Sequence, residues 1–487
     1  MIDILLLLLG HALVWGLGVA LLLCLPGRKP APATDAAGGL RAPGEIAWTL
    51  GAGWFAGAFV LTLAMRGVDA AGVPFGRLSI AGPLLALSIL FAVLALRRAR
   101  GGRGFPAVGD AAAPSSAALP PGWQRWLWYA LLAWLVLRFG LLLAESALRP
   151  LYAWDSWMQW ATKARVWFAL KTMAPFAPFA EWLTGNGATY IDAAPHYPAT
   201  IPLWQVWSAL LIDRWDDSLT NFAWWATAVA LSCVVYGHLR GTGASPLPAL
   251  VGAWFVGSLP ILDTHVALAG YADLPIAGYL TLAVLAALRW TRERNLRDLI
   301  LFALFLIALP TLKNPGKVWA LLLLLTLLVA LAPRQGLRVA GIAAGLGVLA
   351  VLVLAQTRPT ILGYQLHLRG TFPGRGLLDA YFVYANWHLL ALAVVAVALV
   401  GYRSLLRPGI APITVTLAIG MGFLFFGFTF TNAYAWVEDQ STVNRATLHL
   451  APLLVVWVML VFGDWSGRMR VVPTVQDAGA TGGSRPA

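Results

Sequence analysis

The sequence predicts an all-α fold, a polytopic bundle of transmembrane helices, and three observations favour that class. Of the 487 residues, 60% are hydrophobic and only 11% are charged, and the mean hydropathy is +0.74. This proportion of charge is too low to coat one or several soluble domains of this size. Apolar runs long enough, or nearly long enough, to cross about 30 Å of hydrocarbon recur along the chain. The basic residues fall mostly in the short loops between those runs.

Thirteen apolar runs are predicted to span the membrane. They cover residues 4–25, 46–65, 78–96, 126–144, 218–239, 247–262, 266–288, 299–312, 318–332, 339–356, 381–400, 411–431 and 446–463. A fourteenth stretch, 196–212, is short and carries Pro198 and Pro202 near its start. We expect this stretch either to span fully or to re-enter, and the loop charges favour re-entry.

The loop charges predict the orientation. If residues 196–212 do not cross, 20 of the 34 Lys and Arg residues lie on one side, which the positive-inside rule identifies as cytoplasmic. Full crossing would instead place the arginine-rich loop around Arg97 outside. The loops on the opposite side carry 12 of the 21 acidic residues. The net charge of +13 therefore indicates topology and contacts with anionic membrane lipids, and no nucleic acid is expected as a partner.

Three regions are predicted. Residues 1–125 form an N-terminal three-span extension with its cytoplasmic loop, and 126–463 form the transmembrane core with an external loop at 145–217. Residues 464–487 are rich in Gly, Pro, Ser and Thr and predict a disordered cytoplasmic tail. The first run is expected to remain as a span, because it is too long for a cleaved signal peptide. Two cysteines inside apolar runs exclude a disulfide framework.

The stretch "LYAWDSWMQWATKARVWF" (151–168) places Asp155 among four tryptophans at the end of an apolar run. A regular helix over 154–168 lying at the membrane interface would group an apolar side and a polar side. The apolar side would hold Trp154, Trp157, Met158, Ala161 and Phe168, and the polar side Asp155, Gln159 and Thr162. The alternative is an aromatic belt with a solvated aspartate.

Two further stretches on the same side contain an acid or a histidine. "HYP" begins at His196, after Asp192, and either caps the following segment or contributes to a site. "GYADLP" places Asp273 within the apolar run 266–288. An ionisable group within a span is costly and usually faces a cavity, although an acid at the very end of a helix can reach water.

Basic residues complete the pattern. Lys313 and Lys317 in "LKNPGK" lie on the side where the positive-inside rule disfavours lysine, so an anionic partner is expected. Arg445 and His449 are four residues apart and share one helix face, where the arginine could also be an interfacial anchor. Lys163 follows Asp155 in the same stretch.

Five stretches, "AWDSWMQWATKAR", "HYPATIPLW", "GYADLP", "LKNPG" and "NRATLHLAP", resemble signatures of a bacterial branch of the GT-C superfamily. That superfamily comprises polytopic glycosyltransferases that use polyprenyl-phosphate sugars, such as protein O-mannosyltransferases and aminoarabinose transferases. The resemblance covers residues 126–463. It implies that Asp155 matches the first external-loop acid, a general base or acceptor-orienting group, that Asp273 matches the second acid, and that His196 starts the following helix.

The chain departs from that pattern in three places. Tyr197 stands between His196 and the proline, where better-known members have two prolines. Pro315 stands where an acid is expected, so the need for a divalent cation stays open. Three extra spans precede the superfamily's first helix.

The expected function is an inner-membrane glycosyltransferase, inverting, that moves a sugar from a polyprenyl-phosphate donor to a periplasmic-side acceptor. Such a transfer needs a carboxylate to accept the hydroxyl proton and cations to stabilise the leaving phosphate. The expected catalytic residues are Asp155 and Asp273. The expected substrate-binding residues are Lys163, His196, Lys313, Lys317, Arg445 and His449.

Two other classes of function stay open. An oligosaccharide ligase or polymerase would rely on arginine and histidine, as in "HLRGTFPGR" (367–375). A transporter or flippase would use Asp155 and Asp273 as proton or substrate sites. The absence of a clear internal repeat weakens the transporter interpretation.

Overall fold

The computed structural model is a helical bundle, and it describes residues 2–26, 44–100, 122–185, 190–357, 359–361, 364–366 and 372–467. Most of the predicted tail, and residues 367–371 of the stretch considered for a ligase, lie outside those residues. The described strands form two short pairs. These are β1 (Phe176–Ala177) with β2 (Tyr190–Ile191), parallel, and β3 (Thr360–Ile361) with β4 (Tyr364–Gln365), antiparallel. The all-α prediction is confirmed.

Eight helices among the described residues are long and apolar enough to cross a membrane. They are α1 (Ile2–Cys24), α2 (Glu45–Ala70), α3 (Arg77–Arg100), α4 (Trp123–Leu148), α8 (Phe222–Gly241), α11 (Asp273–Glu293), α14 (Pro333–Thr357) and α17 (Ala411–Phe430). A ninth crossing results if α9 (Pro246–Gly257) and α10 (Pro260–Ala267), bent by 54°, form one span. Each of the thirteen predicted runs overlaps a helix, but the number thirteen stays a prediction.

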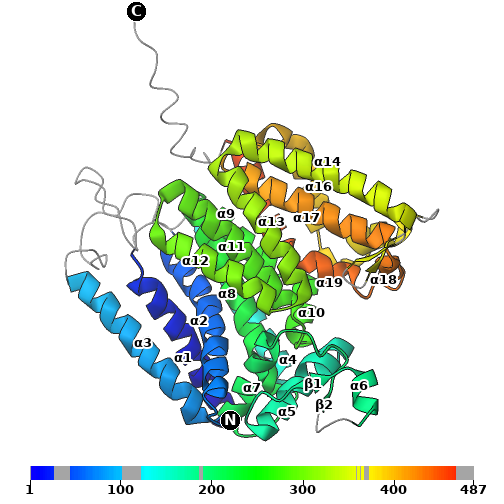
Figure 1. Ribbon diagram of the computed structural model, residues 1–487. Coiled ribbons are helices and arrows are strands. Elements are labelled where there is room, and N and C mark those ends of the chain that lie inside the picture. The colour runs from blue at the N-terminus through cyan, green and yellow to red at the C-terminus, as the bar shows by residue number, and fades with distance from the viewer. Residues whose placement is uncertain are drawn as a thin grey trace, which may run out of the picture.

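The remaining helices are shorter. They are α5 (Thr162–Leu170), α6 (Phe179–Leu183), α7 (Thr200–Ile212), α12 (Leu296–Ala308), α13 (Asn314–Leu331), α15 (Gly374–Leu378), α16 (Leu390–Val400), α18 (Ala435–Glu438), α19 (Val443–Leu448) and α20 (Ala451–Trp465). Helices α1–α3 lie together along one flank of the bundle, and α5, α6, β1 and β2 gather at one end of it (Figure 1).

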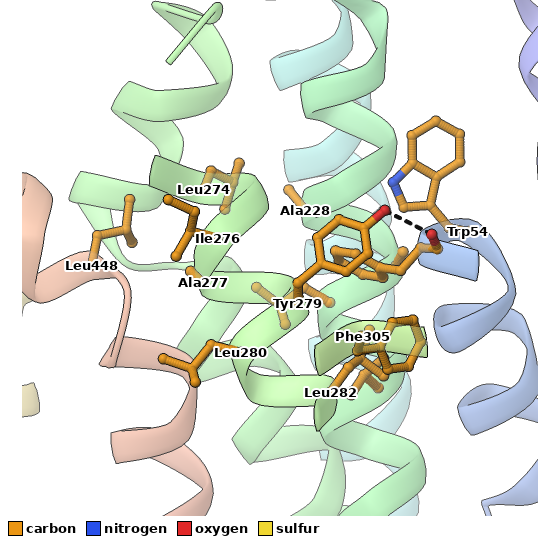
Figure 2. Close-up of a cluster of buried hydrophobic side chains, with 14 of the residues drawn as sticks. Trp54, Ala228, Leu274, Ile276, Ala277, Tyr279, Leu280, Leu282, Phe305 and Leu448 are labelled. Atoms are coloured by element: carbon orange, nitrogen blue, oxygen red, sulfur yellow. Dashed lines mark hydrogen bonds between the residues drawn. The ribbon is translucent and has the colours of Figure 1, made fainter. Parts of the chain in front are cut away.

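Helix α11 is the most buried of the membrane-length helices described, because 94% of its 18-residue apolar stretch is buried inside the protein. Figure 2 shows Tyr279, in the first third of this helix, whose phenol donates a 2.7 Å hydrogen bond to the carbonyl of Phe55 on α2. A Cβ at Gly278 would lie 2.2 Å from the ring of Phe55, so only glycine permits this approach. Helix α11 is therefore apolar along most of its length and carries its charges at its ends.

The three N-terminal helices pack directly on the core. Trp54 of α2 donates to Thr227 Oγ1 of α8 at 3.0 Å. Glu45, the first residue of α2, forms buried ion pairs with Arg289 of α11 and, at 2.7 Å, with Arg297 of α12. Charges at this depth persist only when paired, so this network fixes α2 to the far end of α11.

Helix α7, the stretch predicted to span or re-enter, begins and ends at the same end of the bundle. At its start Thr200 accepts from Arg66, near the end of α2, at 3.0 Å. Just past its end Arg214 pairs with Asp3, at the start of α1, at 2.9 Å. Every residue of α7 is buried. Both ends of α7 therefore contact the same end of the α1–α2 pair, and re-entry into the membrane stays a prediction.

The apolar run 266–288 is interrupted, and α11 begins only at Asp273. Arg138 of α4 holds the preceding break: its Nε donates to the carbonyl of Gly257 at 2.8 Å, and its guanidinium pairs with Asp263 of α10. Gly270 then adopts φ +97°, which an L side chain rarely accepts. The expectation that Asp273 lies inside a span is therefore corrected: it is the first residue of its helix.

Candidate functional site

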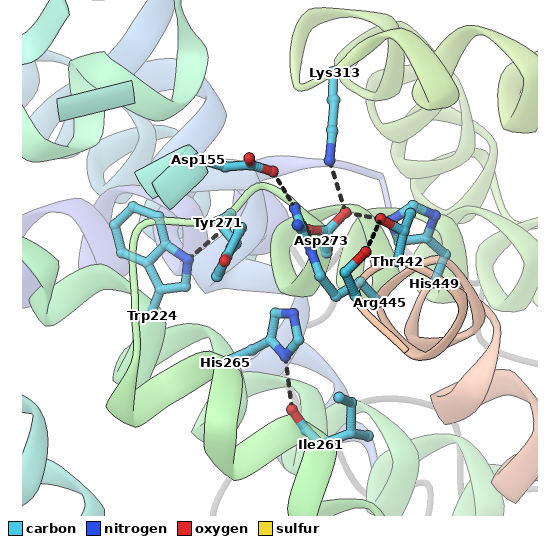
Figure 3. Close-up of polar contacts among 11 residues, drawn as sticks. Asp155, Trp224, Ile261, His265, Tyr271, Asp273, Lys313, Thr442, Arg445 and His449 are labelled. Atoms are coloured by element: carbon cyan, nitrogen blue, oxygen red, sulfur yellow. Dashed lines mark hydrogen bonds and ion pairs between the residues drawn. The ribbon is translucent and has the colours of Figure 1, made fainter. Parts of the chain in front are cut away.

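Five charged or polar side chains from four separate segments meet at one end of α11 (Figure 3). They are Asp155, Asp273, Lys313, Arg445 and His449. All five were predicted site residues, and the structure brings them together. Asp155 and Arg445 lie 290 positions apart in the chain.

Asp273 is the centre of the group and is only 1% exposed. Its Oδ1 accepts from Lys313 Nζ at 3.1 Å and from His449 Nε2 at 3.0 Å. Its Oδ2 accepts from Arg445 Nη2 at 3.0 Å and Nε at 3.2 Å. The position at the start of α11 adds the favourable end of the helix dipole. Asp273 is thus fully occupied as an acceptor.

Arg445 joins the two carboxylates. Its Nη2 also reaches Asp155 Oδ2 at 2.6 Å, and its guanidinium carbon lies 3.9 Å from the centre of the Tyr271 ring. Tyr271 is held by Trp224, whose indole donates to the Tyr271 carbonyl at 2.7 Å. Burial alone would lower the pKa of Arg445, but the charges of Asp273 and Asp155 outweigh burial and raise that pKa.

Asp155 differs from Asp273 because its side chain is 24% exposed and, among the described residues, makes one ion pair, with Arg445. It directly precedes a π-helix, Ser156–Ala161, so the regular α-helical spacing expected over 154–168 is wrong. Ala161 is buried while Trp154 is 61% exposed, which separates two residues expected on one side. A Cβ at Gly270 would lie 2.8 Å from the Cβ of Ser156, so Gly270 lets the Asp155 segment approach Asp273.

The "LKNPG" stretch has a structural explanation. Lys313 precedes α13 in an extended conformation, and Pro315 occupies the first turn, where its missing N–H costs nothing. A Cβ at Gly316 would lie 2.0 Å from the carbonyl oxygen of Leu309, so the chain doubles back closely here. Lys313 can therefore point at Asp273 from this turn, and the turn forms with Pro315 in place of an acid.

His449 is 2% exposed and lies between two partners. Trp319 of α13 donates from Nε1 to His449 Nδ1 at 3.0 Å, and His449 Nε2 faces Asp273. Burial lowers the pKa of His449, and the hydrogen bond and charge of Asp273 only partly oppose it. The sequence did not single out Trp319, because a tryptophan in an apolar run looks like any core residue.

His265 and Tyr271 were also missed as neighbours of the site. His265 Nδ1 bonds the carbonyl of Ile261 at 2.8 Å, and its ring centre lies 5.4 Å from that of Tyr271. Nothing in one sequence reveals which way the His265 ring faces.

Three predicted binding residues lie elsewhere or apart. Lys163 is 2% exposed and bonds the carbonyl of Ala194 at 2.6 Å, with Asp192 at 3.7 Å. His196 and Lys317 are exposed. Lys317 lies in the first turns of α13, whereas Lys313 precedes that helix in an extended conformation. Substrate binding by Lys163, His196 and Lys317 stays a prediction.

Among the described residues there is no group of three or more His, Cys, Asp or Glu side chains arranged to hold a metal ion. Comparison with known proteins adds no assignment: no family model, no curated protein and no solved structure matches this chain. The site must therefore be interpreted from its own geometry. It offers a buried carboxylate that accepts hydrogen bonds on both oxygens, a partly exposed carboxylate with one ion pair, and two cations paired with them.

Proposed function

We propose that the protein is an inner-membrane glycosyltransferase that moves a sugar from a polyprenyl-phosphate donor to a periplasmic-side acceptor. The observation that carries the proposal is Arg445, held between the buried Asp273 and the half-open Asp155. A phosphate needs a cation, and a hydroxyl nucleophile needs a carboxylate beside it. Both groups are present within one ion-pair network.

The two acids have different roles in this proposal. Asp155 accepts the proton of the acceptor hydroxyl, because it is accessible and one of its oxygens makes no hydrogen bond to the described residues. Asp273 holds Arg445 and Lys313 in place. The acceptor oxygen forms a bond to the anomeric carbon, the bond from that carbon to the phosphate oxygen breaks, and the polyprenyl phosphate leaves with the electron pair. One such displacement inverts the anomeric configuration.

Arg445 couples binding to base activation. The incoming donor phosphate competes with Asp155 for the Arg445 guanidinium, whereas Asp273 keeps two bonds to the same group. Loss of the ion pair frees the Asp155 carboxylate oxygen that Arg445 now occupies, at the moment the donor is bound.

A lipid-linked donor is favoured by an apolar cavity near the cluster. The cavity measures about 330 Å³ and is lined by Leu377, Tyr381, Met421, Gly422, Phe425 and Phe428. Tyr381 Oη lies 2.8 Å from Thr447 Oγ1 of α19, the helix that carries Arg445. A cavity of this size and polarity can hold part of an acyl or prenyl chain. The exposed rings of Trp154 and Trp157 are of the kind that lies at headgroup depth.

The test is transfer of labelled sugar from a panel of polyprenyl-phosphate donors in membranes carrying wild type or Asp155→Asn at matched expression. Asparagine keeps the shape and removes the base, so we expect transfer to fall about 100-fold or more. Asp213→Asn is the matched control, because that side chain is 75% exposed at the same end of the bundle. Normal transfer by Asp155→Asn refutes the assignment of the base.

The cavity is tested separately with Gly422→Leu. Gly422 lines the cavity, and a Cβ added there meets nothing within 4 Å, so a larger side chain can be introduced at this wall. We expect a raised KM for long-chain donors and little change for a short-chain analogue. Gly427→Leu on the same helix, also without neighbours within 4 Å but not lining the cavity, should change neither value. Equal effects of both variants on both donors would remove the cavity from the proposal.

If wild type consumes no donor across the panel, the transporter alternative gains support. Flux of a lipid-linked or anionic substrate in sealed vesicles, without covalent product, would then establish it.

A further inference from the structure

The hydrogen bond between Trp319 and His449 determines more than the position of the ring. An indole N–H can only donate, so His449 Nδ1 must accept. The single proton of a neutral imidazole then lies on Nε2, which faces Asp273 Oδ1 at 3.0 Å. Both rings are almost fully buried, at 1% and 2% exposure.

We infer that Trp319 is a positioning residue that keeps His449 a neutral imidazole with its proton on Nε2. A second proton on His449 would place an N–H at Nδ1 against the N–H of Trp319. Two donors facing each other in a buried site leave both without an acceptor. A histidine beside an aspartate normally tends to become charged, and this contact opposes that tendency.

The surrounding charges act in the same direction. His449 is faced by Asp273 from α11, by Lys313 before α13 and by Arg445 from α19, and the ring of His265 on α10 is a further titratable neighbour. Two cations oppose a third positive charge, whereas one carboxylate favours it. Without the indole donor, the balance between them would decide the state of His449.

The fold fixes the indole tightly. Trp319 lies on α13 and packs edge-on against Phe423 of α17, with ring centres 6.0 Å apart. A Cβ at Gly420 would lie 3.3 Å from the Trp319 ring, so the facing helix keeps a small residue there. The indole therefore has little freedom to turn away from His449.

The consequence concerns the charge of the whole cluster. Asp155 and Asp273 carry two negative charges, and Lys313 and Arg445 carry two positive charges, so a neutral His449 leaves the sum at zero. A charged His449 would compete with Lys313 for Asp273 Oδ1, which both now share. Trp319 thereby keeps Lys313 bound to Asp273, and this holds whether or not the site transfers a sugar.

The direct test is ¹⁵N NMR of the purified full-length protein with labelled histidine, titrated from about pH 8 to about pH 5. The His449 signals are identified by their loss in His449→Asn. In wild type we expect one protonated and one unprotonated ring nitrogen across this range. Two protonated nitrogens in wild type near neutral pH, or a proton on Nδ1, would overturn the inference whatever Trp319→Phe does.

The variant arm uses Trp319→Phe, which keeps an aromatic ring and removes the donor. We expect His449 to become protonated on both nitrogens at a pH at least one unit higher than in wild type. Trp457→Phe is the matched control, because Trp457 is a buried indole that donates to Thr414 at 2.9 Å. It should leave the His449 titration unchanged. An identical titration in Trp319→Phe and wild type would refute the positioning role, and neither measurement requires a sugar donor.

Discussion

Replacing Asp273 with asparagine should destabilise the protein far more than the same change at Asp155. Asp273 is 2% exposed at its side chain and neutralises Lys313 and Arg445, which are 12% and 16% exposed. Removing one partner of a buried ion pair typically costs about 3–5 kcal/mol, because a charge is left without compensation. Arg445 keeps Asp155, so the loss falls mainly on Lys313, and we expect about 3 kcal/mol.

The change at Asp155 is milder for two reasons. Its side chain is 24% exposed, and Arg445 retains Asp273 after the substitution. A partly exposed pair contributes about 1 kcal/mol or less. Asp213→Asn, at a side chain 75% exposed, should cost close to nothing.

The assay is thermal unfolding of the three purified variants, with apparent Tm read from the loss of monodisperse protein on size-exclusion chromatography. The expected order of apparent Tm is Asp213→Asn, equal to wild type, then Asp155→Asn slightly lower, then Asp273→Asn lower by several degrees. If Asp273→Asn has the same apparent Tm as Asp213→Asn, the Asp273 carboxylate is not the centre of a buried network and the roles assigned to both acids fail.

Three further outcomes are expected. Gly270→Ala should lower both apparent Tm and sugar transfer, because φ is +97° and the added Cβ meets Ser156. Gly72→Ala, at φ +70° with no neighbour within 4 Å, should lower apparent Tm alone. Equal transfer by the two variants would contradict this. Lys163→Met should destabilise the protein, because it leaves the buried Asp192 carboxylate without its cation. In a double-mutant cycle of unfolding, adding Asp192→Asn should recover much of the lost stability, and additive losses would contradict the pairing. Burial lowers the pKa of His449 in the folded protein below its ordinary 6.5, so the contribution of the neutral ring to stability is present above pH 6.5 and is lost as pH falls. The apparent Tm of wild type should therefore fall more than that of His449→Asn between about pH 7 and about pH 5. Parallel curves of apparent Tm against pH would contradict this.

Much of the site could be predicted from the loop charges, because the side of the membrane on which a loop lies depends only on the order of the helices along the chain. Once the helices alternate in direction, the loops holding Asp155, Asp273, Lys313 and Arg445 must lie at one end of the bundle. Acids and bases retained at one end then tend to pair, since an isolated charge there is costly. The same reasoning favours re-entry for 196–212, and both ends of α7 contact the same end of the α1–α2 pair.

The sequence could not predict which charges pair. Lys163 has the same character as Lys313, yet it is buried against Asp192 and the carbonyl of Ala194. That choice depends on where α5 packs, and hence on the π-helix that follows Asp155. A π-helix adds a residue to one turn without a composition signal of its own, so regular spacing misplaced the faces of 154–168.

The position of Arg445 explains why a membrane protein retains two acids so close together. Two carboxylates sharing a site normally force one of them to take up a proton. Here one guanidinium bonds both, and Lys313 adds a second cation on the buried side, so each carboxylate has a cationic partner. The more exposed acid makes the fewer bonds, which concentrates the weak point of the network at Asp155. An anion that binds Arg445 from the open side would therefore break the Asp155 pair first and leave Asp273 in place. The arrangement joins a stable anchor to one releasable carboxylate, and the proposed general-base chemistry on an anionic donor depends on both.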